Sequence, residues 1–327
     1  MGRRIVRALA TLFIIAALGA ASLWWGRAQF ERPGPLGEEA IVLLPRGIGL
    51  DGIASRLAEA GVIDRPWLFK LGVRLSGASR GLRAGEFAFA PGLSARAVME
   101  HLVAGRTLAR RLTVPEGMTS RRVVALIAAT PGLAGIPGGL PAEGALLPET
   151  YHFSHGDTRA DMVARMAAAM TETLAVLWAA RQPGLPFKTA RDALILASIV
   201  ERESARPEER RHVAGVFINR LRRGMRLQSD PTVIYALDGG ATAFERKLSR
   251  ADLEVDNPYN TYRYAGLPPG PIANPGRESI AAVLDPVPTR DLYFVSDGKG
   301  GLAFAETLAE HNRNVARWRK LRDSQAD

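Results

Sequence analysis

Residues 8–26 form an apolar run of 19 residues without one charged side chain. A helix of this length just spans the hydrocarbon core of a bilayer, which is about 30 Å thick. Three arginines precede the run, and Trp24 and Trp25 stand near its far end, where aromatic side chains gather at a membrane interface. The arginines predict a cytoplasmic N-terminus and a single-pass chain whose remaining residues lie outside the plasma (inner) membrane.

A cleaved signal peptide is the alternative explanation of the same run. The apolar region of a signal peptide is usually shorter and ends in small side chains, whereas residues 24–27 read Trp-Trp-Gly-Arg. We therefore expect a cytoplasmic tail and an uncleaved transmembrane helix over residues 1–27. A linker rich in proline and glycine follows over residues 28–38.

The composition of the chain narrows the classes of function. Its 327 residues are 47% hydrophobic, which supports a folded core of more than one domain. There is no cysteine, and the five histidines show no metal-binding spacing, so we expect neither a metal nor another cofactor. The net charge of +10 could indicate nucleic acid, but the arginine-rich segment 202–226 lacks interleaved aromatics. We expect no nucleic-acid partner; a solvated helix face or an anionic lipid or wall polymer explains the charge.

The residue pattern predicts an α+β fold outside the apolar run, with a small domain over residues 39–106 and a mixed α+β domain over residues 107–327. In the small domain we expect strand, helix, helix, strand and a closing helix, at residues 40–44, 50–60, 67–75, 84–89 and 94–103. In the larger domain we expect a strand, a helix after residues 115–119, helices over 160–177 and 307–319, and a hairpin of 292–295 with 302–304. Between residue 232 and that hairpin we expect short loops and turns.

An uncharged run at residues 193–200 leads directly into Glu201 and Glu203. A buried helix that ends in an acid can hold a carboxyl group partly out of water, which raises its pKa toward that of a general acid. On a helix, Glu203 follows the apolar stripe of Leu196 and Ile199, whereas Glu201 follows smaller and more polar side chains. This pattern favours Glu203 as the working acid and predicts little desolvation of Glu201; a solvated helix end is the alternative for both.

Seven segments occur in an order and spacing that resemble one known family. The chain is identified by them as a member of the endolytic murein transglycosylase family (YceG-like, MltG). The segments are EGALLPETYHF (143–153), ASIVERES (197–204), GVFINRLRRGMRLQSDPTVIY (215–235), KLSRADL (247–253), NPYNTY (257–262), GLPPGPIANPG (266–276) and LYFVSDGKGG (292–301).

The resemblance implies a transmembrane helix, a small LysM-like domain over residues 39–106 and a catalytic domain over residues 107–327. It implies a lyase that cuts the bond between N-acetylmuramic acid and N-acetylglucosamine inside peptidoglycan strands, leaves 1,6-anhydro ends and so ends glycan elongation. Glu203 matches the position of the family's single acid and base. Peptidoglycan synthases (penicillin-binding proteins) are the implied protein partners, beside the glycan strands and the bilayer.

Glycan polymers are held by amide, hydroxyl and aromatic side chains along a groove, and these residue types gather in the matching segments. We expect substrate contacts from Asn219, Gln228, Asp230, Thr232, Tyr235, Tyr259, Asn260, Thr261 and Tyr262. Turn formation at Asp230-Pro231 and Asn257-Pro258 is an alternative reason for some of these residues.

Three other activities remain as alternatives. A muramidase-like hydrolase would use the same cleft, with Asp230 or Glu201 activating water. A glycan-binding scaffold would keep the LysM-like domain and not need Glu203. An aminodeoxychorismate lyase would need a Schiff-base lysine and pyridoxal phosphate, which a lysine-poor chain lying outside the membrane does not favour.

Overall fold

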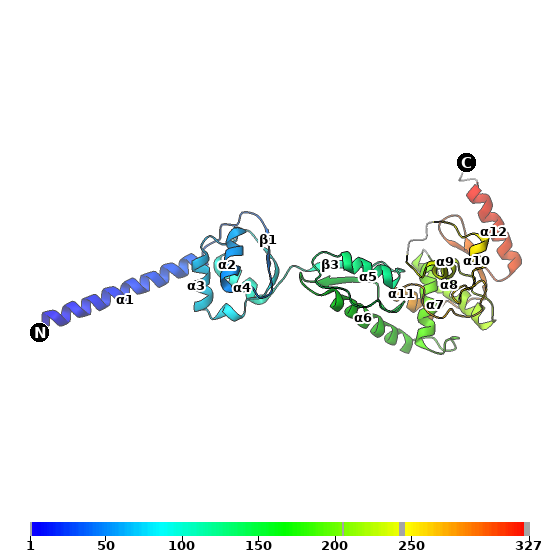
Figure 1. The fold of residues 1–327 in the computed structure, drawn as a ribbon, viewed down its shortest axis with the longest axis horizontal. Coiled ribbons are helices and arrows are strands. Elements are labelled where there is room, and N and C mark those ends of the chain that lie inside the picture. The colour runs from blue at the N-terminus through cyan, green and yellow to red at the C-terminus, as the bar shows by residue number, and fades with distance from the viewer. Residues whose placement is uncertain (1, 205, 242–245, 324–327) are drawn as a thin grey trace. The chain divides into compact units, whose positions relative to one another are not determined.

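The computed structural model describes residues 2–204, 206–241 and 246–323. It is a mixed α+β structure with an apolar N-terminal helix, which confirms the predicted fold class at that level (Figure 1). Contacts divide the chain into two compact units. Unit 1 is Met1–Arg110 with Phe153–Gly156, and unit 2 is Arg111–His152 with Asp157–Asp327. The first predicted domain begins at residue 1 and the last ends at residue 327. Residues 1 and 324–327 lie outside the described residues.

Unit 1 has one two-stranded antiparallel sheet with helices packed against it. Ala40 lies opposite Phe89 and Leu44 lies opposite Gly85, and alternate side chains of both strands enter the core. The elements match the predicted strand, helix, helix, strand and helix closely. They are α1 (Gly2–Glu31), β1 (Ala40–Leu44), α2 (Leu50–Glu59), α3 (Pro66–Leu75), η1 (Ala78–Arg80), β2 (Gly85–Phe89) and α4 (Ala95–Ala104).

The segment predicted as a linker is fixed to unit 1. Helix α1 continues to Glu31, and the segment after it is pinned by an ion pair between Arg32 and Asp64. The Gly34 amide donates to the carbonyl of Gly92 over 3.3 Å, and a side chain at Gly34 would collide with the neighbouring backbone. The proline and glycine content therefore permits close packing here and does not indicate a free tether.

Unit 2 contains two more two-stranded sheets and most of the helices. Helix α6 is apolar and long enough to cross a membrane, but it packs into unit 2 through a stripe of buried methionines. The elements are β3 (Arg110–Thr113, beginning at the last residue of unit 1), α5 (Ser120–Ala129), β4 (Thr150–Phe153), α6 (Arg159–Ala179), α7 (Ala190–Glu203), η2 (Pro207–Glu209), α8 (Arg210–Arg222), α9 (Asp230–Asp238), α10 (Arg250–Leu253), α11 (Arg277–Leu284), β5 (Tyr293–Ser296), β6 (Leu302–Ala305) and α12 (Leu308–Asp323).

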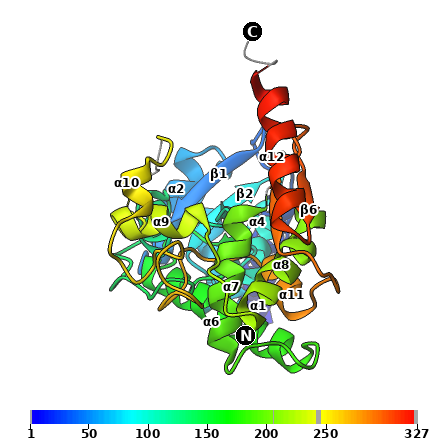
Figure 2. The same cartoon turned by 90° about the vertical axis from the view of Figure 1, so that its right-hand side faces the viewer.

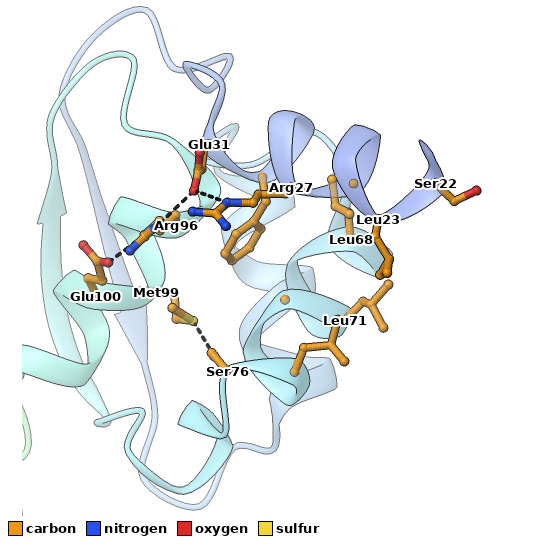
Figure 3. A pocket seen from close by; sticks show the side chains of 14 residues that line it. Ser22, Leu23, Arg27, Glu31, Leu68, Leu71, Ser76, Arg96, Met99 and Glu100 are labelled. Atoms are coloured by element: carbon orange, nitrogen blue, oxygen red, sulfur yellow. Dashed lines mark hydrogen bonds and ion pairs between the residues drawn. The ribbon is translucent and has the colours of Figure 1, made fainter. Parts of the chain in front are cut away.

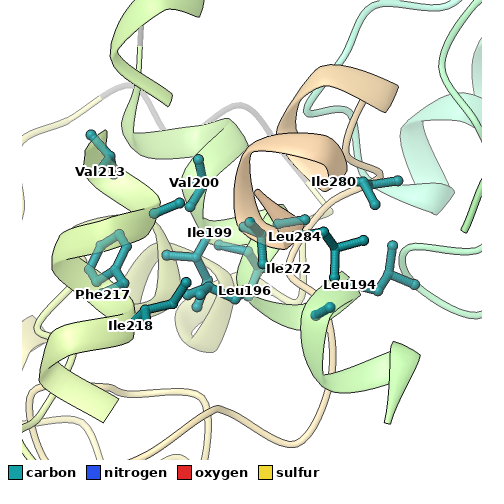
Figure 4. Close-up of a cluster of buried hydrophobic side chains, with 14 of the residues drawn as sticks. Leu194, Leu196, Ile199, Val200, Val213, Phe217, Ile218, Ile272, Ile280 and Leu284 are labelled. Carbon is teal, nitrogen blue, oxygen red and sulfur yellow. The ribbon is translucent and has the colours of Figure 1, made fainter. Parts of the chain in front are cut away.

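Helix α7 is the centre of unit 2. It begins at a capping box in which Thr189 and Asp192 satisfy each other's backbone amides, and α8 and α11 pack against it (Figure 2). All eight residues of 193–200 are buried, which confirms the predicted buried helix. Leu196 and Ile199 are enclosed by apolar side chains from α8, α11 and the loop before α11 (Figure 4).

Three short helices, α9, α10 and α11, occupy the described part of the region where the sequence predicts only short loops and turns. Asp230 and Pro231 begin α9 instead of forming an isolated turn, because proline is tolerated in the first turn of a helix, where no amide partner is needed. Helix α11 has only eight residues, and the apolar ones among them are buried against α7 and α8. Such short helices depend on tertiary packing, which a local pattern does not reveal.

Candidate active site

A pocket of about 450 Å³ opens in unit 2 where α7 ends and α9 begins. Strand β5 and helix α12 form its opposite wall. Four of the residues predicted for the site line this pocket, namely Glu203, Gln228, Asp230 and Tyr262. Carboxylate, amide and phenol groups from three separate segments of the sequence thus meet in one cavity.

Glu203 is the last residue of α7, and the chain turns to an extended conformation at Ser204. The side chain is therefore carried to the pocket wall by a helix whose preceding turns are locked in the core. The hydroxyl of Ser229 donates a hydrogen bond of 2.6 Å to Oε1 of Glu203. Burial raises the pKa of the Glu203 carboxyl group to about 7; the negative charge of Asp230 also raises it, while the Ser229 hydrogen bond and the charge of Arg220 oppose the shift. Near neutral pH this group can both donate and accept a proton.

The backbone of Ser229 is held in place by two threonines that the sequence predicts as substrate contacts. Thr232 Oγ1 donates to the Ser229 carbonyl over 2.6 Å and lies 2.8 Å from Thr261 Oγ1. Thr261 Oγ1 accepts from the Ser229 amide over 3.0 Å. Both threonine side chains are fully enclosed by protein. They support the residue that contacts Glu203 and do not themselves line the pocket.

Asp230 and Tyr262 form a second polar pair at the pocket. The Tyr262 hydroxyl donates to Oδ1 of Asp230 over 2.6 Å. Burial and the hydrogen bond to Asp230 raise the pKa of the Tyr262 hydroxyl, so that it stays a proton donor. The Asp230 side chain remains exposed at the pocket rim, where it can also reach a ligand.

Gln228 has φ of 52°, and it is the one non-glycine residue with positive φ in the described part of the chain. A residue other than glycine in this left-handed conformation carries a backbone free-energy cost of about 1–2 kcal/mol. The backbone amide of Gln228 donates to the Thr261 carbonyl over 3.1 Å, which helps to hold this backbone conformation. The side chain is exposed in the pocket. A strained backbone at a pocket wall is a recurrent mark of ligand-binding residues.

Glu201 has a different environment from the one predicted. Its side chain is 4% exposed, so the expectation of little desolvation is wrong. One carboxylate oxygen lies 3.1 Å from a guanidinium nitrogen of Arg210, which also pairs with Glu116 over 2.9 Å. The other oxygen accepts the Gly276 amide over 2.9 Å. Helix-face reasoning missed this burial because the partners come from other segments.

The remaining predicted contacts lie away from the pocket, and their polar groups support the fold. The Asn219 amide donates to the carbonyls of Thr289 and Asp291. The buried Asn260 amide donates to the carbonyls of Leu253 and Val255.

Tyr235 and Tyr259 pack against each other elsewhere in unit 2, with ring centroids 4.8 Å apart. Tyr235 faces the buried carboxyl group of Glu143, and burial raises its pKa to about 12. Burial likewise raises the pKa of Glu143, whose carboxylate accepts the Ser120 amide over 2.7 Å.

Sequence reasoning missed three further residues that bring polar groups to the pocket, namely Arg220, Tyr293 and His311. Arg220 donates to the carbonyls of Leu227 and Leu292, and its guanidinium lies 5.4 Å from the ring centroid of Tyr293. Tyr293 stacks in turn on His311, with ring centroids 5.2 Å apart.

Nδ1 of His311 is buried and has no hydrogen-bond partner among the described residues. Burial and the nearby charge of Arg220 lower the pKa of His311, which favours its neutral form. A lone histidine on the C-terminal helix carries no signal that would place it beside Glu203.

Within the described ranges, no three histidine, aspartate or glutamate side chains come together as a metal site would require. The Glu203 carboxyl group, the Ser229 hydroxyl beside it and the polar side chains of the pocket walls are all supplied by this protein. The site is therefore equipped for proton transfer to and from a polar ligand.

Comparisons with known proteins show which family the chain belongs to. The sequence model of the YceG-like family matches residues 42–317. A protein of Bacillus subtilis (strain 168) named endolytic murein transglycosylase is 32% identical over 301 residues, which cover 83% of this chain and 82% of that protein. A Streptococcus pneumoniae (strain R6) protein of the same name is 28% identical over 318 residues, 84% of this chain and 57% of that longer protein.

A crystal structure of a YceG-like protein from Listeria monocytogenes is also similar. It superposes with a TM-score of 0.52 at 30% sequence identity and covers 84% of this chain and 99% of that one. The family match extends over most of both units and includes every residue of the pocket described above. The chain belongs to the YceG-like family.

Proposed function

We propose that this protein is an endolytic lytic transglycosylase that cuts the β-1,4 bond between N-acetylmuramic acid and N-acetylglucosamine within peptidoglycan strands. The observation that carries the proposal is the Glu203 carboxyl group, which lies in a polar pocket with a pKa raised to about 7. The names of the relatives support the substrate class and the endolytic mode of cutting.

The proposed reaction needs one carboxyl group. Protonated Glu203 gives its proton to the glycosidic oxygen, and the bond to C1 of the muramoyl unit breaks. The ionised Glu203 then takes the proton of the muramoyl C6 hydroxyl, whose oxygen bonds to C1 and closes a 1,6-anhydro ring. A pKa near the working pH serves both steps, because neither protonation state is costly to reach.

The other pocket residues would hold the glycan. Gln228, Asp230 and Tyr262 would hydrogen-bond hydroxyl and acetamido groups of the sugars. We assign a supporting role to the other residues that the sequence suggested as substrate contacts. Thr232 and Thr261 hold Ser229 beside the pocket, and Asn219, Tyr235, Tyr259 and Asn260 support the fold elsewhere in unit 2.

A muramidase-like hydrolase is the second candidate, because Asp230 lines the same pocket and could activate water. Glu201 is poorly suited to that role, since both its oxygens are engaged by Arg210 and Gly276. Mass spectrometry of the products of purified protein and peptidoglycan separates the two reactions. Transglycosylation gives 1,6-anhydromuramoyl ends, whereas hydrolysis gives reducing ends heavier by one water.

We further propose that α1 anchors the protein in the plasma membrane, with a cytoplasmic N-terminus and all residues after α1 outside. The helical stretch Leu9–Glu31 contains an 18-residue window with a mean hydropathy of 1.8 and no buried residue, which supports an anchor. A reporter enzyme fused after Asp327 should be active only outside the cytoplasm. Reporter activity inside the cytoplasm, or a mature N-terminus near residue 27, would contradict this topology.

The domain boundaries at residues 38, 106 and 327 and the LysM-like character of the small domain also remain proposals. In this proposal residues 39–106 bind glycan and help residues 107–327 to hold their substrate. The proposed anchor keeps the cut near newly made strands, where peptidoglycan synthases would be partners. Deletion of residues 38–105 should weaken glycan binding without changing which bond is cut; unchanged binding would leave the small domain as a spacer.

A further inference from the structure

Helix α3 carries an exposed apolar stripe on the surface of unit 1. Trp67, Leu71 and Leu75 are 54%, 45% and 72% exposed and stand four residues apart, so they lie along one face of the helix. The opposite face, with Phe69 and Val73, is buried in the core of unit 1. A helix with two apolar faces can pack one face in the core of unit 1 and place the other in a second apolar environment.

The stripe borders a groove of about 540 Å³ that separates the end of α1 from α3 and α4. Leu23 of α1 faces Leu68 and Leu71 of α3 across this groove, and Met99 of α4 closes its far side (Figure 3). The groove thus joins the exposed face of α3 to the apolar surface of the helix that we propose as the anchor.

The end of α1 is locked to unit 1, so the position of this groove along the anchor is fixed. The Phe30 ring packs on α3 at Gly72, where any side chain would come within 2.5 Å of the ring. Arg96 of α4 pairs with Glu31 over 2.8 Å, and Arg65 donates to Gln29 over 2.9 Å. Helix α3 therefore cannot move independently of the last turns of α1.

The depth of the stripe follows from helix geometry. The uncharged run at residues 8–26 is about 28 Å long at 1.5 Å per residue, close to the thickness of the hydrocarbon core. Leu23 is three residues before the outer end of the run, which places it about 5 Å inside the hydrocarbon edge. Leu71 shares a groove with Leu23, so α3 lies at the level where hydrocarbon gives way to lipid headgroups.

The charges around the stripe match a lipid interface. The guanidinium of Arg65 lies 5.7 Å from the Trp25 ring centroid, and Lys70 and Arg74 lie on the same helix as the stripe. Tryptophan and leucine on one face with basic side chains beside them are the pattern of helices that lie in the headgroup region of anionic membranes.

We propose that the Trp67–Leu71–Leu75 stripe of α3 rests in the outer leaflet of the phospholipid bilayer and seats unit 1 on the membrane beside its own anchor. This inference depends on the proposed anchor and not on the proposed reaction. Because residues 32–36 are also pinned to unit 1, the unit is held at the bilayer surface instead of being carried on a free tether.

The absence of cysteine makes a direct test possible, because single cysteines can be labelled in the full chain. Nitroxide labels at Leu71→Cys and Leu75→Cys are measured in nanodiscs of phosphatidylglycerol and phosphatidylethanolamine. Collisions with oxygen report lipid, and collisions with a water-soluble nickel complex report water. Leu12→Cys in the apolar run of α1 and Ser55→Cys on the exposed surface of α2 are the two reference positions.

The expected result is a loss of nickel collisions at positions 71 and 75 relative to position 55, toward the level at position 12. Water-like exposure at 71 and 75 together with lipid-like exposure at 12 would overturn the proposal and leave the anchor intact. Water-like exposure at position 12 would overturn both. Protection of the stripe only in native membranes, and not in nanodiscs, would indicate a protein partner and would also overturn the proposal.

A second variant keeps the test independent of the labelled positions. Trp67→Glu places a charge on the stripe and should raise nickel collisions of a label at position 75, while the thermal unfolding of unit 1 stays unchanged because Trp67 lies outside the core. Ser55→Glu, on α2, should leave the label at position 75 as it was. Equal effects of the two variants would refute a specific contact of the stripe with lipid.

Discussion

Replacing Glu203 with glutamine should make the protein more stable at neutral and alkaline pH and nearly inactive. Glutamine keeps the shape of the side chain and still accepts the hydrogen bond of Ser229, which now spans 2.6 Å to Oε1 of Glu203. It removes the need to hold a negative charge in a buried place. Burial raises the pKa of Glu203 from an ordinary 4.5 to about 7, so the folded state binds this proton more tightly than the unfolded chain does.

The sign and size of the stability change follow from that difference in pKa. A carboxyl group with a raised pKa in the folded state costs no stability below pH 4.5, and its cost grows between pH 4.5 and 7 and is constant above. A difference of roughly 2.5 pKa units corresponds to a cost of about 3 kcal/mol above pH 7, about 2 kcal/mol at pH 6 and almost none at pH 4. Glutamine carries no charge and avoids this cost, so the free energy of unfolding of the variant should exceed that of the wild type by these amounts at each pH.

Urea unfolding of the full chain in one detergent, repeated at pH 4, 6 and 8, measures the gain. Glu172→Gln, at an exposed position on α6, is the matched control and should show little change at any of the three pH values. Cleavage of peptidoglycan by Glu203→Gln should fall by about 10²–10⁴-fold, because the amide carries no transferable proton. A stability gain that is absent at pH 8, or equally large at pH 4, would refute the assignment of a raised pKa to this carboxyl group.

Three further changes test the residues around the acid. Ser229→Ala removes a hydrogen-bond donor that favours ionised Glu203, so the alkaline fall of kcat/KM should move to higher pH. Ser279→Ala, at an equally buried serine, is the control and should leave the pH of this fall unchanged. Gln228→Gly should change unfolding stability little, because relief of the left-handed backbone offsets the added chain entropy, yet lower the cleavage rate as much as Gln228→Ala does. Glu201→Gln should lower stability in thermal unfolding by about 1.5–3 kcal/mol, because it removes one of the two carboxylates that pair with the buried Arg210. Hydrolysis products alone, from this variant or from the wild type, would count against the proposed chemistry.

The features that could be predicted from sequence are those set by local periodicity. The run at residues 193–200 is too apolar to be exposed, so a buried helix ending near Glu203 follows from the pattern, and the structure confirms it. The strands of unit 1 and the hairpin of β5 and β6 follow for the same reason, since alternating side chains and glycine turns specify them locally. The residue pattern within each of these elements is enough to predict it.

The pocket around Glu203 could be predicted only in part, because its walls come together through tertiary contacts. The pattern contains nothing that brings Ser229 to the end of α7 or His311 to the opposite wall. The hydroxyl groups of Thr232 and Thr261 predict substrate contacts, whereas in the structure those hydroxyls lie inside the pocket wall and hold Ser229. Residue type indicated that these side chains matter to the site but not whether they face the ligand.

The two glutamates at the end of α7 show why the partners of a side chain, and not its own helix, decide its chemistry. Both carboxyl groups are withdrawn from water, and they stand two residues apart on one helix. Glu201 meets the guanidinium of Arg210 and the amide of Gly276, which satisfy a full negative charge. Glu203 meets one hydroxyl and the like charge of Asp230, and the charge of Arg220 does not offset its burial, so the pKa of Glu203 is raised. Arg210 makes Glu201 part of a structural ion pair, whereas Glu203 has no ion-pair partner among the described residues and is available for proton transfer.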